Sequence, residues 1–335
     1  MSIDQKILVI RFSSIGDIVL ATSPLKTIRQ KFPNAQITFL TLDTFAPLFE
    51  FHPHIDALIG IDKNKSLRGL WDFSHYINQQ RYHHIFDLHN SLRSNLVTLW
   101  NSGPISQVEK PRWKRFMLFQ FHENQFSENF STRFMYHQYL GENIWREGDP
   151  IPDTFLSVSD REKSLADELV KSKGLGNHYL TIVPGAAWRQ KQWSVNKYID
   201  FIQQVDKHVI LLGAMKDKVC FQIKEKIPTV LNLAGKTSLR QALAVLSNSM
   251  HVIGSDTGLV HAAEALGVPV TMILGPTSVE TGAGVLLDGS STIEKDLWCR
   301  PCSQNGNRPC YRKSQVCMDN IHVDDLLNSI PETLS

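Results

Sequence analysis

The sequence predicts an α/β protein with two doubly wound parallel sheets. Its 335 residues exceed what one ordinary hydrophobic core covers, which favours two domains. In both halves, short apolar runs alternate with segments of helical length, and such alternation is typical of parallel sheets covered by helices on both faces. The segment Gly148–Asp160, rich in proline and small polar residues, separates the two series and is interpreted as the linker.

The first series starts with an apolar strand close to the N-terminus. The expected strands are Lys6–Phe12, Gln36–Leu42, Ala57–Ile61 and His83–Leu88, with helices near 67–80 and 91–100. A helix should also follow the first strand and break in two. Ser23 before Pro24 predicts this break, because serine is a favourable N-cap and proline suits the first helical position.

The second series repeats the pattern after the linker. Its expected strands are 179–183, 208–212, 230–233, 250–254 and 268–274, with helices near 194–205, 216–226, 239–247 and 259–266, and a closing helix at 322–334. Ligands of such sheets bind at the carboxyl ends of the strands. We therefore expect the functional side chains in the loops that follow strands, bordering a cleft between the two sheets.

Composition excludes several classes of protein. A net charge of +2 argues against a dedicated nucleic-acid binder. No secretory signal is visible at the N-terminus and no apolar stretch approaches the length of a membrane span, so a cytoplasmic location is expected. Between Lys63 and Arg133, however, the sequence contains ten lysines and arginines but only five acidic residues, which indicates a surface for an acidic partner.

The most informative segment runs from Ser255 to Thr277, SDTGLVHAAEALGVPVTMILGPT. It predicts a strand, an acidic turn at Asp256, a helix opened by Thr257 and Gly258, and a second buried strand. Free N–H groups and the positive end of a helix dipole favour an anion at such a turn. His261 lies one turn into the helix and could face the same anion, although a structural helix histidine remains the alternative. The pattern predicts a phosphorylated ligand.

A second candidate site follows the first strand of the second series, in PGAAWRQKQW. Gly185 would permit close approach of the backbone, and Lys191 could reach a phosphate, shielded by Trp188 and Trp193. An ordinary surface lysine is the alternative. Since no Asp-x-Asp pair occurs, this lysine, a histidine and helix N–H groups would neutralise a leaving phosphate without a metal.

In the first series, Asp17 ends the loop RFSSIGD directly after the first strand. Two interpretations are equally favoured by position: an acid that stabilises the first turn of a helix, and a general base at the carboxyl edge of the sheet. The loop lacks the glycine pattern of a dinucleotide-binding motif, and no P-loop motif occurs in the chain.

Taken in order, these motifs resemble the bacterial heptosyltransferases, glycosyltransferase family 9. The resemblance covers nearly the whole chain through IRFSSIGDIVLATSPL, PGAAWRQKQW, NLAGKTSLRQ, SDTGLVHAAEALGVPV and LGPTS. It implies a GT-B architecture, with an acceptor-binding domain at 1–155, a nucleotide-sugar-binding domain at 156–320 and a closing helix at 321–335. It also implies inverting transfer of heptose from ADP-L-glycero-D-manno-heptose to the lipopolysaccharide inner core.

The resemblance implies roles for individual residues. Asp17 would be the catalytic base, Lys191 would meet the donor phosphate, and Asp256 would contact the transferred sugar. The diphosphate would be held by Thr257, Gly258, Leu259 and His261, with Gly185 also at the donor. Ser14 and Arg93 are expected to contact the anionic lipopolysaccharide precursor that serves as acceptor.

Two further segments have open interpretations. Lys110–Phe121, KPRWKRFMLFQF, mixes cations with aromatic rings and suits the surface of an anionic membrane, whereas a helix with an aromatic stripe facing the core is equally favoured. Four clustered cysteines near the C-terminus could hold a structural zinc ion, which catalysis would not require. They are Cys299, Cys302, Cys310 and Cys317.

Three alternatives to heptose transfer remain at this stage. A GT-B transferase could use another nucleotide sugar or another glycan acceptor. A sugar-nucleotide epimerase or hydrolase would need the donor site but no acceptor surface. A non-catalytic binder is disfavoured, because it would need no base at Asp17.

Overall fold

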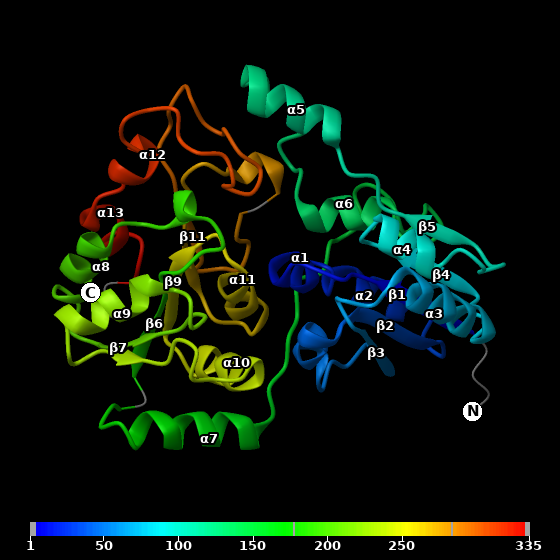
Figure 1. Cartoon of the computed structure of the whole chain (residues 1–335), viewed down its shortest axis with the longest axis horizontal. Coiled ribbons are helices and arrows are strands. Elements are labelled where there is room, and N and C mark those ends of the chain that lie inside the picture. Colours follow the sequence, from blue (N-terminus) through cyan, green and yellow to red (C-terminus); the bar gives the residue numbers. More distant parts are fainter. Residues whose placement is uncertain (1–4, 177, 283, 332–335) are drawn as a thin grey trace. The chain divides into compact units, whose positions relative to one another are not determined.

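The computed structural model describes residues 5–176, 178–282 and 284–331. The chain divides into two compact units. The first unit comprises residues 1–110 and 132–157, and the second comprises 111–131 and 158–335. Figure 1 shows the order of the elements along the chain. The segment 111–131 thus groups with the second unit although it precedes the end of the first in sequence.

The first unit is built on a five-stranded parallel sheet in the order β3-β2-β1-β4-β5. Its strands are β1 (Lys6–Ile10), β2 (Gln36–Leu42), β3 (Ala57–Ile61), β4 (His84–Asp87) and β5 (Ile105–Gln107). The first four match the predicted apolar runs, while β5 is a three-residue edge strand that the sequence did not reveal. The chain changes direction across the sheet between β1 and β4, so the loops after these two strands lie at the topological switch point.

The helices of the first unit are mostly short. They are α1 (Ile15–Leu20), α2 (Ser23–Lys31), the 3-10 helix η1 (Asp43–Phe49), α3 (Leu67–Gln79), α4 (Leu92–Val97) and α6 (Thr132–Gln138). The predicted break before Pro24 is confirmed, but the predicted cap is wrong. Thr22 is the N-cap of α2, and the hydroxyl of Ser23, already inside the helix, donates to the carbonyl of Pro152.

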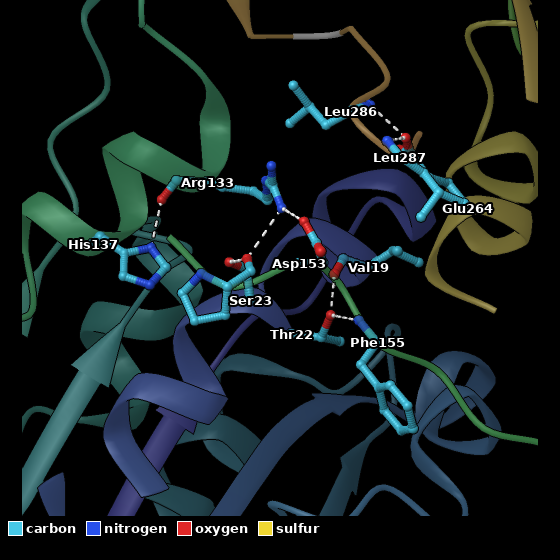
Figure 2. A network of polar contacts seen from close by, with 11 residues as sticks. Val19, Thr22, Ser23, Arg133, His137, Asp153, Phe155, Glu264, Leu286 and Leu287 are labelled. Carbon is cyan, nitrogen blue, oxygen red and sulfur yellow. Dashed lines mark hydrogen bonds and ion pairs between the residues drawn. The ribbon is translucent and has the colours of Figure 1, made fainter. Parts of the chain in front are cut away.

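The segment interpreted as a linker is ordered against the first unit over much of its length. Arg133 donates to the Pro152 carbonyl at 3.0 Å and to Asp153 at 2.8 Å, as Figure 2 shows. The N–H of Phe155 donates to the hydroxyl of Thr22 at 2.9 Å. These contacts explain why the boundary between the units falls after Ser157.

The second unit contains a six-stranded parallel sheet in the order β11-β10-β9-β6-β7-β8. Its strands are β6 (Tyr179–Val183), β7 (His208–Leu211), β8 (Leu231–Asn232), β9 (His251–Ser255), β10 (Val270–Ile273) and β11 (Ser291–Ile293). Only β11, again a short edge strand, was not predicted. The switch point lies between β6 and β9, which pair directly from Leu180 opposite His251 to Val183 opposite Gly254.

Several helices of the second unit, among them the one at residues 160–171, were not predicted from the sequence. The helices of this unit are α5 (Arg112–Phe121), α7 (Asp160–Lys171), η2 (Arg189–Lys191), α8 (Val195–Ile202), α9 (Lys218–Lys226), α10 (Leu239–Ser247), α11 (Gly258–Ala265), η3 (Val279–Thr281), α12 (Val316–Asp319) and α13 (Val323–Leu327). Helix α7 begins where the linker was expected to end, with Ser159 and Glu162 forming a capping box. Among the described residues, no helix combines the length and apolarity that crossing a membrane requires.

The C-terminal segment packs into the core of the second unit. Trp193 is 1% exposed, and its indole N–H donates to the carbonyl of Ile321 at 3.0 Å. Leu326 and Ile330 complete the same core cluster. The closing helix is shorter than predicted, ending at Leu327, and residues 332–334 lie outside the described part of the chain. Trp193 is therefore a core residue and does not shield Lys191.

Candidate active site

Three of the predicted donor residues meet at the switch point of the second unit. Lys191 follows β6 and Asp256 follows β9, and since these strands are neighbours their loops are adjacent. The Nζ atom of Lys191 lies 2.6 Å from Oδ2 of Asp256, with the two side chains 13% and 15% exposed. On the other side, Nε2 of His261 lies 3.4 Å from Oδ1 of Asp256. The carboxylate therefore stands between a lysine and a histidine.

The charge of Asp256 is fixed by these neighbours. Burial alone would raise its pKa, but Lys191 and the hydrogen bond from His261 more than offset this, so the pKa lies well below its usual value. Asp256 is ionised at neutral pH, and Lys191 is held in one position by a partly desolvated ion pair. Positioned charges of this kind interact with a ligand without first reorganising.

The first turn of α11 offers free donors beside this pair. Thr257 is the N-cap, yet its hydroxyl makes no capping bond. Its Oγ1 and the Nδ1 of His261 are buried atoms that lack a hydrogen-bond partner in the described part of the chain. Buried polar groups are normally paired, so unpaired ones next to a helix N-terminus indicate a polar ligand. Gly258 and Leu259 follow as the first two residues of the helix.

Two further hydroxyl groups, not chosen from the sequence, share this property. Thr277 and Ser278 follow β10, the strand beside β9, and are 1% and 2% exposed. Neither hydroxyl has a partner as a side-chain donor or acceptor within the described ranges. The signal was present in the sequence, because both residues come directly after a buried strand in LGPTS.

Gly185 packs against Asp217, in the loop that follows β7. A Cβ atom at this position would lie 2.4 Å from Cγ of Asp217, so the missing side chain makes room for that carboxylate. Asp217 in turn accepts the N–H of Ala214 at 2.7 Å and shapes the loop after β7. A contact between Gly185 and a ligand stays a prediction.

Helix α11 is also anchored at its far end. The carboxylate of Glu264, 8% exposed, accepts the backbone N–H groups of Leu286 and Leu287, as drawn in Figure 2. This ties the segment before β11 to the helix that carries His261. A carboxylate here satisfies two backbone donors that a hydrophobic residue would leave without this partner.

In the first unit, Asp17 occupies the switch-point loop after β1. Its Oδ2 lies 2.9 Å from a guanidinium nitrogen of Arg11 and accepts the N–H and the hydroxyl of Ser14 at 3.1 and 3.0 Å. The structural interpretation is thus correct, since Asp17 forms a capping box at α1. Its side chain is nevertheless 41% exposed, which leaves the carboxylate open to a second partner.

The pKa of Asp17 follows from the same contacts. Burial acts to raise this pKa, while Arg11 and both hydrogen bonds from Ser14 lower it, and the net result is a pKa below the usual value. Asp17 is therefore ionised throughout the physiological pH range.

His89, on the loop after β4, is a residue that the sequence reading did not select. Its ring makes an edge contact with Phe12 at 5.3 Å, and its buried Nδ1 has no partner among the described residues. Burial and the cations of Arg11 and Lys110 lower the pKa of His89 to about 3. The histidine is thus neutral and can accept or donate a hydrogen bond at this edge of the sheet.

The two predicted acceptor residues have partners within the first unit. Ser14 uses its hydroxyl on Asp17. Arg93, on the first turn of α4, donates to the carbonyl of Lys63 at 2.5 Å and contributes to the low pKa of His89. Asp17, His89 and Arg93 therefore belong to one electrostatic neighbourhood.

The predicted zinc site is not supported. Among the described residues, which include all four cysteines, no group of three or more His, Cys, Asp and Glu side chains is arranged to hold a metal ion. All four are free thiols, with Cys299 and Cys317 buried and Cys310 exposed.

The basic aromatic segment forms helix α5 and presents its rings to the surface. Trp113, Phe116 and Phe121 are 66%, 47% and 64% exposed, and the rings of Trp113 and Phe116 stack at 5.6 Å. Of the ten helix residues only Leu118 is buried. The stripe of aromatic residues does not face the core.

Comparison with known proteins agrees with this picture. The sequence profile of the family described as glycosyltransferase family 9 (heptosyltransferase) matches residues 70–310. Lipopolysaccharide heptosyltransferase 2 of Salmonella typhimurium is 25% identical over 298 residues, covering 82% of this chain and 84% of that protein.

Solved structures show the same fold. A family 9 glycosyltransferase from Veillonella parvula superposes with a TM-score of 0.77 at 19% identity, covering 98% of this chain and 97% of the other. The Escherichia coli ADP-heptose lipopolysaccharide heptosyltransferase II gives a TM-score of 0.73 at 22% identity, covering 97% of each chain. The predicted GT-B architecture of two Rossmann-like units is confirmed.

Proposed function

Because this chain belongs to glycosyltransferase family 9, the heptosyltransferases, we propose that it transfers a heptose from ADP-L-glycero-D-manno-heptose to an inner-core acceptor of lipopolysaccharide. The similarity to lipopolysaccharide heptosyltransferases over most of the chain supports this assignment. The observation that carries it is the cluster of Lys191, Asp256 and His261 at the N-terminus of α11, beside buried hydroxyl groups that have no partner among the described residues.

In the proposed reaction an acceptor hydroxyl attacks the anomeric carbon of the heptose from the face opposite ADP. The new C–O bond forms as the bond to the diphosphate breaks, and the electron pair of that bond leaves on the phosphate oxygen. Asp17 takes the proton of the attacking hydroxyl. Lys191 and the N–H groups at the start of α11 stabilise the charge that develops on ADP, while Asp256 contacts the sugar.

The donor residues suffice for this task without a metal. Lys191 and a helix N-terminus supply positive charge at one position, the ring of His261 adds a hydrogen-bonding group, and Thr257, Thr277 and Ser278 add hydroxyl groups. We assign the diphosphate to the first turn of α11, at Gly258 and Leu259, and the acceptor to Ser14, His89 and Arg93.

A thermal-shift screen tests the donor class. We expect ADP and ADP-heptose to raise the melting temperature more than UDP, GDP or CDP do, because a ligand that binds only the folded state stabilises it by mass action. A preference for UDP would indicate a transferase for another nucleotide sugar. Steady turnover of the donor without acceptor would indicate an epimerase or hydrolase.

The pH profile tests the base. Since the pKa of Asp17 is lowered, kcat/KM should show no acid limb from this residue above about pH 4, the ordinary value for aspartate. Ionised Asp17 likewise stabilises the fold above that pH and loses this contribution as the pH falls through its folded pKa. The measurement is kcat/KM of the wild type and of Asp17→Asn between about pH 4.5 and about pH 8. An acid limb at about pH 6 that the wild type shows and Asp17→Asn lacks would contradict the assignment.

We further propose that α5 places the enzyme on the inner face of the cytoplasmic membrane, where a lipid-linked acceptor is found. Three exposed aromatic rings beside Arg112 and Lys114, with no acid in the helix, suit an anionic bilayer surface. In flotation with phosphatidylglycerol vesicles, Arg112→Gln with Lys114→Gln should lower the bound fraction several-fold. The matched control replaces two exposed lysines at the end of α7, Lys171 and Lys173, and equal loss in both proteins would contradict the proposal.

A further inference from the structure

The four cysteines lie on a segment that contacts the donor residues directly. This cysteine segment, residues 299–317, is separated from β11 by five residues and ends inside α12, within the second unit. Its contacts reach two parts of the candidate site: Lys191, and the turn Gly275–Ser278 after β10. These contacts are made by groups of the segment other than the cysteine side chains.

The first contact is between Gly306 and the side chain of Lys191. Gly306 has a φ of +75°, a conformation that favours glycine. A Cβ atom there would lie 2.5 Å from Cγ and 2.8 Å from Cδ of Lys191. The aliphatic stem of the lysine therefore crosses the bare backbone of Gly306 on its way to Asp256.

A second contact fixes the backbone beside the lysine. The side-chain amide of Gln315 donates to the carbonyl of Gln190, the residue before Lys191. Ser303, 1% exposed, accepts the N–H of Gly306 at 3.0 Å and so holds the glycine in its conformation. The lysine is thus restrained both at its backbone and along its stem.

The third contact holds the turn after β10. Arg300, whose side chain is 7% exposed, donates to the carbonyls of Gly275 and Thr277 and pairs with Glu294 at 2.8 Å. Pro276, between the two, accepts the N–H of Cys302 at 3.1 Å. Arginine suits this task, because its planar group donates in several fixed directions at once.

We propose that the cysteine segment is a positioning element of the donor site. Gly306 and Gln315 set the place of the Lys191 ammonium, and Arg300 sets the turn that presents Thr277 and Ser278. The inference rests on the proposed function, because it holds that fixing Lys191 and this turn in place strengthens binding of the donor diphosphate. It predicts that changes at Gly306 and Gln315, which take no part in the proposed reaction, act through Lys191.

Gly306→Ala tests the contact. The new methyl group displaces the lysine stem, and because misplacement by about 1 Å can cost up to about 10²-fold, we expect kcat/KM for ADP-heptose to fall about tenfold. Gly174→Ala is the matched control. Gly174 also has a positive φ, of +80°, but its Cβ would meet nothing within 4 Å, so this variant shares the backbone strain and not the contact.

A double-mutant comparison separates positioning from general damage. If Gly306 acts through Lys191, Gly306→Ala should add no further loss to Lys191→Ala. Gln315→Met removes the hydrogen bond to Gln190 without straining the backbone, and it too should add no further loss to Lys191→Ala. This variant tests the inference even if Gly306→Ala does not fold. Full activity of both single variants, or losses that multiply with Lys191→Ala, would overturn the inference.

The ADP dissociation constant, measured by calorimetry, keeps the two proposals apart. If the wild type transfers heptose and the variants match it in activity and in ADP affinity, only the positioning role is ruled out. A wild type that binds ADP without transferring heptose removes the proposed function, and weaker ADP binding by Gly306→Ala still supports the positioning role. A wild type that does not bind ADP overturns both.

Discussion

Replacing Asp17 with asparagine is expected to lower heptose transfer by about 10²–10⁴-fold, the range that a positioned general base contributes. The amide keeps the size of the side chain and one oxygen that can accept from Ser14, but it cannot take a proton at neutral pH. ADP affinity should not change, because the donor residues belong to the second unit. Turnover with ADP-heptose and calorimetry with ADP measure the two effects.

The capping role of Asp17 requires its own control. Ser14→Ala removes one of the two hydrogen bonds between Ser14 and Asp17 while leaving the carboxylate and the Arg11 ion pair in place. At saturating acceptor this variant should keep most of its kcat, with the loss of the Ser14 contact appearing in KM for the acceptor, and show a small loss of stability, about 1 kcal/mol. If it were as inactive as Asp17→Asn, the effect of the latter would reflect the geometry of the loop. Retention of more than a tenth of wild-type turnover by Asp17→Asn would remove the residue from the role of base.

Lys191→Ala should reduce kcat by about 10²–10³-fold, by analogy with the loss of one preorganised donor at an oxyanion site. It should also destabilise the second unit, because the Asp256 carboxylate, 15% exposed, loses its cation. The pKa of Asp256 would then rise toward its usual value, since Lys191 is the main group that lowers it. Single-turnover kinetics and chemical denaturation measure the two losses.

A second substitution separates the chemical loss from the structural one. In Lys191→Ala with Asp256→Asn no unpaired carboxylate remains, so the stability should recover in part. Transfer should not recover, because the donor phosphate still lacks its cation. Restored activity in the double variant would show that Lys191 serves only to neutralise Asp256.

The sequence was most informative where hydrophobic patterning is strong. Four strands of the first unit and five of the second appeared at or close to the predicted ranges, because buried parallel strands are continuous apolar runs. The edge strands β5 and β11 were missed, since three residues such as Ile105–Gln107 carry too little pattern. Capping was also misjudged at Ser23, where a tertiary contact with Pro152 competes for the hydroxyl.

The candidate site was predictable in part and for a definite reason. Lys191, Asp256 and His261 each follow or open an element at the switch point, so position alone brought them under consideration. Asp217 and Gly306 could not be found this way, because their importance lies in what fills the space beside Gly185 and Lys191. Such packing between distant segments leaves no periodic signal in a single sequence.

The ion pair between Lys191 and Asp256 bears on how quickly the nucleotide product can leave. A cation that already has a counter-ion gives only part of its charge to an arriving phosphate, and it does not stand alone when that phosphate departs. Release of ADP therefore avoids the cost of leaving an unpaired ammonium group in a poorly hydrated place. The ion pair thus lowers the affinity for the ADP product, which favours its rapid exchange for the next sugar donor.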